Sequence, residues 1–331
     1  MTKQIVIGVD GGGTSTRVAL ATDQGEVLGI GNAGAGNYHD VGVDVVRSNI
    51  AKALAEAWSL AGIEQQQADA AFLGLGSVAS EADRNTIRQV AKDLSLAKNE
   101  KVGVDHDLRV ALAGGLIGKP GIILIAGTGS SCFGINGNGD TWRSGGWGPR
   151  LDDIGSSGWL GLQSMIAIVR AHDGRGKPTV LSKRVLEALE ISEIDQILHR
   201  VDGEGLTRRE KGTLAKLVTE AAAQGDLVAQ DIIAAGTDEL GLLIATVANQ
   251  LGLPESLGTV PVAITGGLTK AGDVFLGPLR QAVQRRSSAC EVIEPKLPPV
   301  MGAVLLAIQS LGIDTSPEVV NNLANSQAVC H

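Results

Sequence analysis

The feature that most constrains the fold is a short phrase that opens the chain. Residues 4–9 (QIVIGV) form an apolar run, which enters the turn Asp10–Thr16 (DGGGTST) and leaves it as a second apolar run at 17–22 (RVALAT). A turn that contains Gly25 leads to a third run at 26–31 (EVLGIG). Runs of this length separated by glycine-containing turns predict three strands joined by hairpins.

The same phrase begins again at residue 121, which is 117 residues after its first start at residue 4. Its order is strand 121–126 (GIILIA), turn 127–131 (GTGSS), strand 132–135 (CFGI), turn NGNGD and strand 141–143 (TWR). The copies share a pattern of elements more than residues, so chance similarity between two three-stranded meanders is the alternative. The repeat predicts two related halves, and a length of 331 residues allows two domains.

Helices and strands alternate after each copy. Apolar spacing predicts a helix at 43–61 that ends at Gly62. Before the second copy we also predict a strand at 70–75, a helix at 81–94, a strand at 100–104 and a helix at 107–113. After it we predict helices at 156–171, 179–189, 207–224 and 226–251, a strand at 260–264, a helix at 273–285, a strand at 291–293 and a helix at 301–311.

This alternation predicts an α/β protein. We place the domains at 1–112 and 113–331, and we expect that the helix near 301–311 can pack back on the first domain. The mixed pattern of residues 316–331 supports no assignment.

The composition excludes several classes of protein. A formal net charge of −8 argues against a nucleic-acid partner. Cys132, Cys290 and Cys330 are widely separated, which disfavours a disulfide framework, a zinc site or an iron–sulfur cluster. The longest apolar stretch, at 240–247, is too short to span a membrane, and no leader pattern precedes the first strand. We therefore expect a cytoplasmic protein without a membrane partner.

The turn Asp10–Thr16 is a candidate phosphate loop. It matches neither a P-loop nor the dinucleotide fingerprint, and a strand follows it where those motifs need a helix. Its glycines and hydroxyls can nevertheless bring backbone N–H groups against phosphate oxygens; they are Gly11, Gly12, Gly13, Thr14, Ser15 and Thr16. Asp10 at the strand end could hold a magnesium ion. The alternative is an ordinary glycine-rich turn in which Asp10 is a turn-forming residue.

Two further turns have a similar composition. The first contains Gly127, Thr128, Gly129 and Ser130, and the second contains Gly266 and Gly267 between a strand and a helix. Two phosphate loops and a neighbouring glycine pair could together surround a nucleotide. This combination is a more specific signal than any one of the turns.

Five stretches then carry a resemblance: GVDGGGTSTRVAL, DHDLRVALAGG, IILIAGTGSSC, GGWGPRLDDIGSSGWLG and AITGGLTKAG. In this order they resemble the N-acetylglucosamine kinase branch of the BadF/BadG/BcrA/BcrD ATPase family, over residues 5–310. That family belongs to the actin-like, sugar-kinase and Hsp70 superfamily. The resemblance implies two ribonuclease-H-like domains around a central cleft. It also implies transfer of the γ-phosphoryl group of ATP, with Mg²⁺, to the 6-hydroxyl of N-acetylglucosamine or glucosamine.

The resemblance further implies roles for single residues. Asp107 would be the general base that accepts the proton of the sugar hydroxyl. The two loops would hold the ATP phosphates, and Gly266 and Gly267 would lie by the adenosine. The implied sugar-binding residues are Asn37, Ser77, Asp107, Gly146, Trp147 and Asp153.

The residues by themselves leave alternatives to these roles. Asp105 competes with Asp107, which could equally be an ordinary helix N-cap, as could Asp153. Asn37 alone would be a loop residue. The cluster Trp142, Trp147 and Trp159 suits a flat face that stacks on a sugar ring, although core packing is the commoner role of a single tryptophan.

One departure from the family pattern bears on the substrate. Kinases of the family often have an acidic residue directly after the position of Asp153, where this chain has Ile154, so the 2-substituent of the sugar stays open. The alternatives to a kinase are an ATPase activator of a radical dehydratase or reductase, and a sugar or nucleotide sensor without catalysis. The activators need cysteines that bridge two subunits, and no cysteine here lies in such a motif. A homodimer is implied by the resemblance alone.

Overall fold

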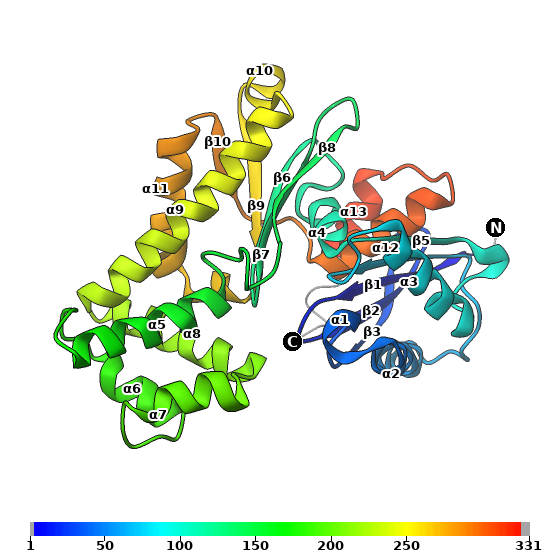
Figure 1. Ribbon diagram of the computed structural model, residues 1–331. Helices are drawn as coiled ribbons and strands as arrows, with labels where there is room; N and C mark the ends of the chain where they lie inside the picture. The colour runs from blue at the N-terminus through cyan, green and yellow to red at the C-terminus, as the bar shows by residue number, and fades with distance from the viewer. Residues whose placement is uncertain (1–2, 326–331) are drawn as a thin grey trace. The chain divides into compact units, whose positions relative to one another are not determined.

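A computed structural model describes residues 3–325, apart from the side chains of 202–204 and 208–209 (Figure 1). Cys330 therefore lies outside the described residues. The chain forms two compact units, and we call them unit 1, up to Lys119 and again from Glu294, and unit 2, Pro120–Ile293. The sequence analysis divided the chain at 112/113 and assigned all that follows to one domain. The structure continues the helix that begins at Asp107 to Leu116 and returns the chain to unit 1 at Glu294.

The sheet of unit 1 has the strand order β3-β2-β1-β4-β5. Its strands are β1 (Ile5–Gly11), β2 (Thr16–Thr22), β3 (Val27–Ala33), β4 (Ala70–Leu75) and β5 (Val102–Asp105). β1, β2 and β3 pair antiparallel, whereas β4 and β5 run parallel to β1. Gly25, in the turn between β2 and β3, has a φ of +78°, which explains why the hairpin has glycine there.

Helices cover both faces of this sheet because the side chains of β1 alternate. Ile7 packs in the core that α2 (Val43–Ala61) and α3 (Glu81–Asp93) close, and Val6 packs in the core that α12 (Pro299–Ser310) closes. The remaining helices of unit 1 are α1 (Tyr38–Val41), η1 (Lys98–Glu100), α4 (Asp107–Leu116) and α13 (Pro317–Asn325). A Cβ on Gly8 would lie 2.6 Å from the backbone nitrogen of Val304, so glycine permits the close approach of α12 to β1.

The sheet of unit 2 has the order β10-β9-β6-β7-β8, which is the order of unit 1 read from the other edge. Its strands are β6 (Gly121–Ala126), β7 (Ser130–Ile135), β8 (Thr141–Gly145), β9 (Val260–Thr265) and β10 (Cys290–Ile293). In each unit three antiparallel strands are followed by two strands parallel to the first of them. The predicted repeat is therefore confirmed in the strand order, and chance similarity of two meanders is excluded.

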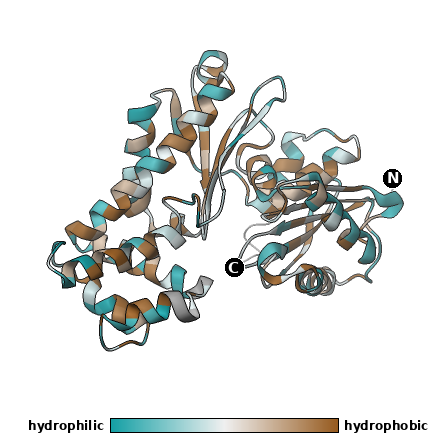
Figure 2. Ribbon diagram, in the orientation of Figure 1, coloured by the Kyte–Doolittle hydropathy of each residue, from teal (hydrophilic) through white to brown (hydrophobic). Residues whose placement is uncertain are grey.

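Unit 2 is otherwise helical. Its helices are α5 (Ser157–His172), α6 (Leu181–Ala188), α7 (Gln196–Leu198), η2 (His199–Glu204), α8 (Arg208–Ala223), α9 (Leu227–Gln250), α10 (Leu253–Leu257), η3 (Gly267–Ala271) and α11 (Asp273–Arg286). The long helix α9 mixes hydrophobic and hydrophilic residues along its length (Figure 2), and its buried residues join the core under β6 and β7. Within residues 3–325, no helix is long and apolar enough to cross a membrane.

Candidate active site

The first candidate phosphate loop joins β1 to β2, at the carboxyl end of β1. A hydrogen bond of 2.9 Å from Gly12 N to Ser15 O closes the loop. Two more backbone bonds of 2.8 Å attach neighbouring segments, because Gly11 O accepts from Gly76 N and Gly12 O accepts from Gly36 N. Gly76 and Gly36 directly precede Ser77 and Asn37. The loop thus brings two of the predicted sugar-binding residues to its own edge.

Two aspartates interact at this edge of the sheet. Asp10 is the last residue but one of β1. Burial raises the pKa of its partly buried carboxyl group to about 7, the charge of Asp107 adds to the shift, and Arg17 opposes it. Arg17 lies directly opposite Asp10 on β2. A Cβ on Gly76 would lie 3.0 Å from Asp107 Oδ2, so the end of β4 leaves room for that carboxylate. The structure therefore groups Asp107 with the first loop.

Asp105 does not share this environment. Its Oδ1 accepts hydrogen bonds of 2.9 Å from Arg84 and from the backbone N–H of His106. Asp107 is also not the N-cap of α4, because His106 occupies that position and accepts from Arg109 N. The carboxylate that can act beside the loop is therefore that of Asp107.

Asn37 and Ser77 lie on either side of the Asp10–Thr16 loop. Asn37 is not simply a loop residue: it is the N-cap of α1, and its Oδ1 accepts from His39 N at 3.1 Å. Ser77 is only 2% exposed, and its hydroxyl has no hydrogen-bond partner among the residues that the structure describes. The hydroxyl of buried Thr16 likewise has no hydrogen-bond partner among these residues. Buried polar groups without partners are uncommon, so these two hydroxyls are candidates to bind a ligand.

The second loop, Gly127–Ser130, joins β6 to β7 in unit 2. Gly127 N donates to Gly129 O at 3.0 Å, and Gly127 O accepts from Ser157 N at the start of α5 at 2.8 Å. Asp153 lies against this loop, because its Oδ1 accepts from Ser130 N at 3.3 Å and a Cβ on Gly129 would lie 2.9 Å from its Oδ2. The two hairpin loops are thus similar in backbone and in the presence of a carboxylate.

Asp153 is not a helix N-cap, which was its interpretation from the residues alone. Ser156 caps α5, and its side chain accepts from Trp159 N. Asp153 is 7% exposed and has a φ of +61°, a conformation that residues other than glycine adopt rarely. Such a backbone position is often found at ligand sites, where the surrounding structure holds it.

Gly266 and Gly267 begin the short helix η3 after β9. Gly266 has a φ of +111°, and a Cβ there would lie 2.4 Å from the carbonyl oxygen of Ala126. Ala126 directly precedes Gly127. The glycine pair therefore lies beside the second loop, and only glycine fits this approach of two backbones.

Gly146 and Trp147 follow β8. The Trp147 side chain is 70% exposed, and the guanidinium of Arg143 lies 5.6 Å from the centre of its ring. Arg143 also donates to Gly146 O at 3.5 Å. A Cβ on Gly146 would lie 2.6 Å from Ser131 Oγ, a buried hydroxyl without a partner in the described part of the chain. Ser131 is the last residue of the predicted turn 127–131, whereas no motif singled out Arg143.

The tryptophan cluster is only partly an exposed face. Trp142 on β8 is 44% exposed, and Trp147 is the most exposed tryptophan of the three. Trp159 instead packs against the core of unit 2, where its ring approaches Gly236. The prediction of a flat face of three tryptophans is therefore wrong for Trp159, because α5 turns this residue inward.

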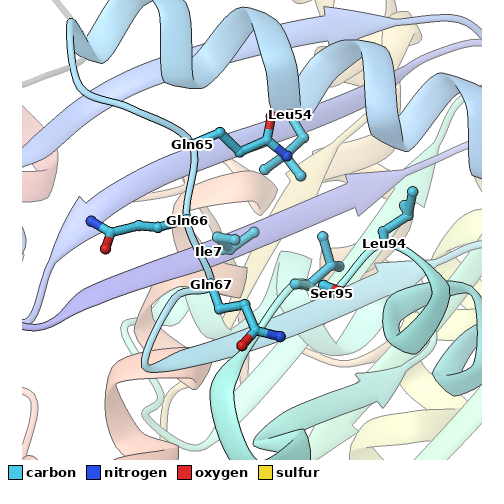
Figure 3. A pocket seen from close by; sticks show the side chains of 8 residues that line it. Ile7, Leu54, Gln65, Gln66, Gln67, Leu94 and Ser95 are labelled. Carbon is cyan, nitrogen blue, oxygen red and sulfur yellow. The ribbon is translucent and has the colours of Figure 1, made fainter.

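A hollow of about 210 Å³ lies elsewhere in unit 1 (Figure 3). Its lining residues are Ile7, Leu54, Gln65, Gln66, Gln67, Leu94, Ser95 and Leu96. The three glutamines belong to the segment between α2 and β4, as Figure 3 shows, and therefore lie before the amino end of β4. Ser77 follows the carboxyl end of the same strand. The hollow is therefore not part of the candidate site.

Two related sheets, each with a glycine- and hydroxyl-rich hairpin loop beside a carboxylate, define an actin-like ATPase. The family model described as the BadF/BadG/BcrA/BcrD ATPase family matches residues 7–307. The chain belongs to this family, which confirms the resemblance found in the sequence.

Curated relatives and a solved structure agree with this assignment. The chain is 29% identical to the N-acetylmuramic acid/N-acetylglucosamine kinase of Clostridium acetobutylicum, over 91% of the chain and 97% of that relative. It is 30% identical to the N-acetyl-D-glucosamine kinase of Dictyostelium discoideum, over 94% of the chain and 99% of that relative. A candidate N-acetylglucosamine kinase of Chromobacterium violaceum has a similar structure, with a TM-score of 0.75 and 26% identity, over 92% of this chain and 99% of that one.

Proposed function

We propose that this protein phosphorylates the 6-hydroxyl of N-acetylglucosamine with MgATP, and that Asp107 is the general base. Its family and its relatives make it an amino-sugar kinase, and the proposal adds the acceptor atom and the residue roles. The observation that carries the proposal is the grouping of Asp107 and Asp10 beside the first loop, next to Asn37 and Ser77. Glucosamine is the second candidate acceptor.

The proposed step needs a base and a way to hold the phosphates. Asp107 accepts the proton of the sugar hydroxyl as this oxygen forms its bond to the γ-phosphorus and the bond to ADP breaks. The backbone N–H groups of Asp10–Thr16 and Gly127–Ser130 would hold the phosphates, with Gly266 and Gly267 by the adenosine. Asn37, Ser77, Gly146, Trp147 and Asp153 would bind the sugar. We propose that both loops bind the same nucleotide.

The residues beside the first loop fit a magnesium ion. In enzymes of this kind Mg²⁺ is usually held by one or two carboxylates together with substrate phosphates and water, and when bound it neutralises phosphate charge. Asp10 is a partly buried carboxylate at such a position. Burial and the charge of Asp107 raise its pKa, and a cation bound beside it would lower the pKa again and favour the charged form. Asp10 would therefore be the protein ligand. Among the described residues no group of three metal-binding side chains exists, which suits an ion held mainly by phosphate.

The activator alternative is disfavoured by the two described cysteines. Cys132 and Cys290 are fully buried on strands of unit 2, where they cannot reach a cluster shared with another subunit. The sensor alternative predicts binding without turnover and is separated by the assay below. The homodimer and the cytoplasmic location stay predictions.

The acceptor is tested by a panel of sugars. With MgATP, release of ADP should be fastest with N-acetylglucosamine or glucosamine and much slower with N-acetylmannosamine and glucose. Phosphorus-coupled NMR of the product should place the phosphate on O6. Binding of the sugar without release of ADP would favour the sensor, and a brown protein that contains iron would favour the activator.

A third candidate acceptor, N-acetylmuramic acid, is favoured by the cation beside Trp147. This sugar differs from N-acetylglucosamine by a lactyl ether on O3, which ends in a carboxylate. The guanidinium of Arg143 lies over the ring of Trp147 and donates to the carbonyl oxygen of Gly146, and neither of these partners neutralises its charge. Ser131 supplies a hydroxyl without a partner in the described part of the chain, beside Gly146. A guanidinium and a hydroxyl together can bind a carboxylate.

Arg143→Met is therefore expected to lower kcat/KM for N-acetylmuramic acid by about 10- to 100-fold, because a hydrogen bond to a charged group is lost. The value for N-acetylglucosamine should change by less than about threefold. Arg150→Met, in the segment that follows β8, is the control and should leave the ratio of the two substrates unchanged. A rise in the KM of ATP in the Arg143 variant would instead assign the guanidinium to a phosphate.

A further inference from the structure

Asp83 joins the two segments that carry Asn37 and Ser77. Besides their bonds to the first loop, these segments meet a second time at the start of α3. Asp83 is 8% exposed and uses its two carboxylate oxygens for different purposes. Its Oδ2 accepts from Ala79 N at 3.0 Å and from the backbone and side chain of Ser80, each at 2.7 Å. This oxygen completes the capping box of α3.

Asp83 Oδ1 is directed at α1 instead. The hydroxyl of Tyr38 donates to it, and His39 Nε2 lies 3.3 Å from it. His39 Nε2 also lies 3.1 Å from the carbonyl oxygen of Ser77. Because both neighbours of this nitrogen are acceptors, we assign its proton to Nε2. The rings of Tyr38 and His39 are in contact, with centroids 4.2 Å apart.

The balance of forces shows how strongly the carboxylate is held. Burial alone would raise the pKa of Asp83, but hydrogen bonds from Tyr38, from the Ser80 side chain and from the backbone of 79–80 outweigh it and hold the pKa well below its usual range. A charged acceptor with this many donors is rigid. The cap of α3 needs only Oδ2, so the contacts at Oδ1 require another explanation.

We propose that Asp83, Tyr38 and His39 form a clamp that sets the spacing between Asn37 and Ser77 and thereby the affinity for the sugar. These three are positioning residues, since none of them needs to contact the substrate. The clamp rests on the proposed function, because that function assigns Asn37 and Ser77 to the sugar. His39 N donates to Asn37 Oδ1 and His39 Nε2 faces Ser77 O, so one residue links the side chain of Asn37 to the backbone of Ser77.

Tyr38→Phe tests the clamp because it removes a donor to Oδ1 and leaves the capping box intact. The KM for the sugar should rise about tenfold, in line with the loss of one hydrogen bond to a charged group, while kcat and the KM of ATP stay within about twofold. His39→Gln keeps an amide donor that can replace Nε2–H but loses the ring contact with Tyr38, so it should show a smaller rise of the same kind. The two substitutions together should raise KM by less than the product of the single effects, since they share one oxygen.

Ser80→Ala is the matched control, because it weakens the cap of α3 without touching Oδ1. It should lower the melting temperature at least as much as Tyr38→Phe and leave the KM for the sugar unchanged. An unchanged KM in Tyr38→Phe, or an equal rise in Ser80→Ala, would show that Asp83 is only a helix cap and would overturn the clamp. A wild-type protein that phosphorylates no amino sugar is a different result, and it would overturn the proposed function and the clamp together.

Discussion

Asp107→Asn is expected to lower kcat for the best sugar by about 10²- to 10⁴-fold, the usual range for loss of a general base. The amide has nearly the shape of the carboxylate but cannot accept the proton of the sugar hydroxyl. Asp107 lies at the start of α4, beside Gly76 and close enough to Asp10 to raise the pKa of that residue. The KM for the sugar should change far less than kcat, because the amide can still hydrogen bond to the hydroxyl.

Asp105→Asn is the control for this prediction. Asp105 is two residues away and pairs with Arg84, so its loss should destabilise the protein slightly and leave kcat within a few-fold. Steady-state rates with N-acetylglucosamine and a circular-dichroism melt of each variant decide the matter. Full turnover in Asp107→Asn, or an equal loss in Asp105→Asn, would mean that the base is another group.

Asp10→Asn is expected to lower kcat by at least about 10²-fold. The same substitution is expected to stabilise the free protein at pH 8. Folding raises the pKa of Asp10 from its ordinary value of 3.8 to about 7, mainly through burial. A carboxyl group whose pKa is raised by folding contributes stability that is fully present below the unfolded pKa. That contribution is lost as the pH rises through the folded pKa.

The gain in Asp10→Asn should therefore be largest above pH 7 and should shrink as the pH falls toward 5. At pH 8 the gain in the free energy of unfolding is on the order of 2–4 kcal/mol. The upper end corresponds to the full rise of the pKa from 3.8 to about 7, at about 1.4 kcal/mol for each pKa unit. Urea unfolding at pH 5, 6, 7 and 8 without nucleotide or magnesium measures it. Arg17→Gln provides a second check, because it removes the charge that opposes the shift and should destabilise the wild type at pH 8 but not the Asp10→Asn protein. A constant difference across this range would contradict the raised pKa.

Much of the fold could be predicted because its signals are local. The helix at 43–61 has the predicted bounds, since its apolar spacing ends at Gly62, whose φ of +67° stops the helix. Strands 70–75 and 121–126 likewise agree residue by residue, because turn residues bound their apolar runs. The short helices α1, α7 and α10 were not predicted. Elements of three to five residues are too short to show a helical period.

The candidate site divides in the same way. The glycine loops and Asp107 are recognisable because turns and motifs keep their residues close in the sequence. The clamp at Asp83 is not, because Tyr38 and Asp83 are 45 residues apart and no motif joins them. Arg143 was not predicted either, since what distinguishes it is its contact with Gly146 and Trp147. Ser131 was recognisable only as the end of the turn 127–131, and its place beside Gly146 was not.

The sequence by itself determined the strands, the hairpin loops, their repetition and the family, because each depends on neighbouring residues whose spacing can be read directly. Only the tertiary structure decided which carboxylate belongs to which loop. In unit 1, Asp105 pairs with Arg84, whereas Asp107 lies close to Asp10. In unit 2, Ser156 is the N-cap of α5, and Asp153 lies against Gly129. The tertiary structure also returned α12 to unit 1. The physical reason is that these contacts depend on the packing of strands and helices far apart in the chain, which leaves no periodic trace in a single sequence.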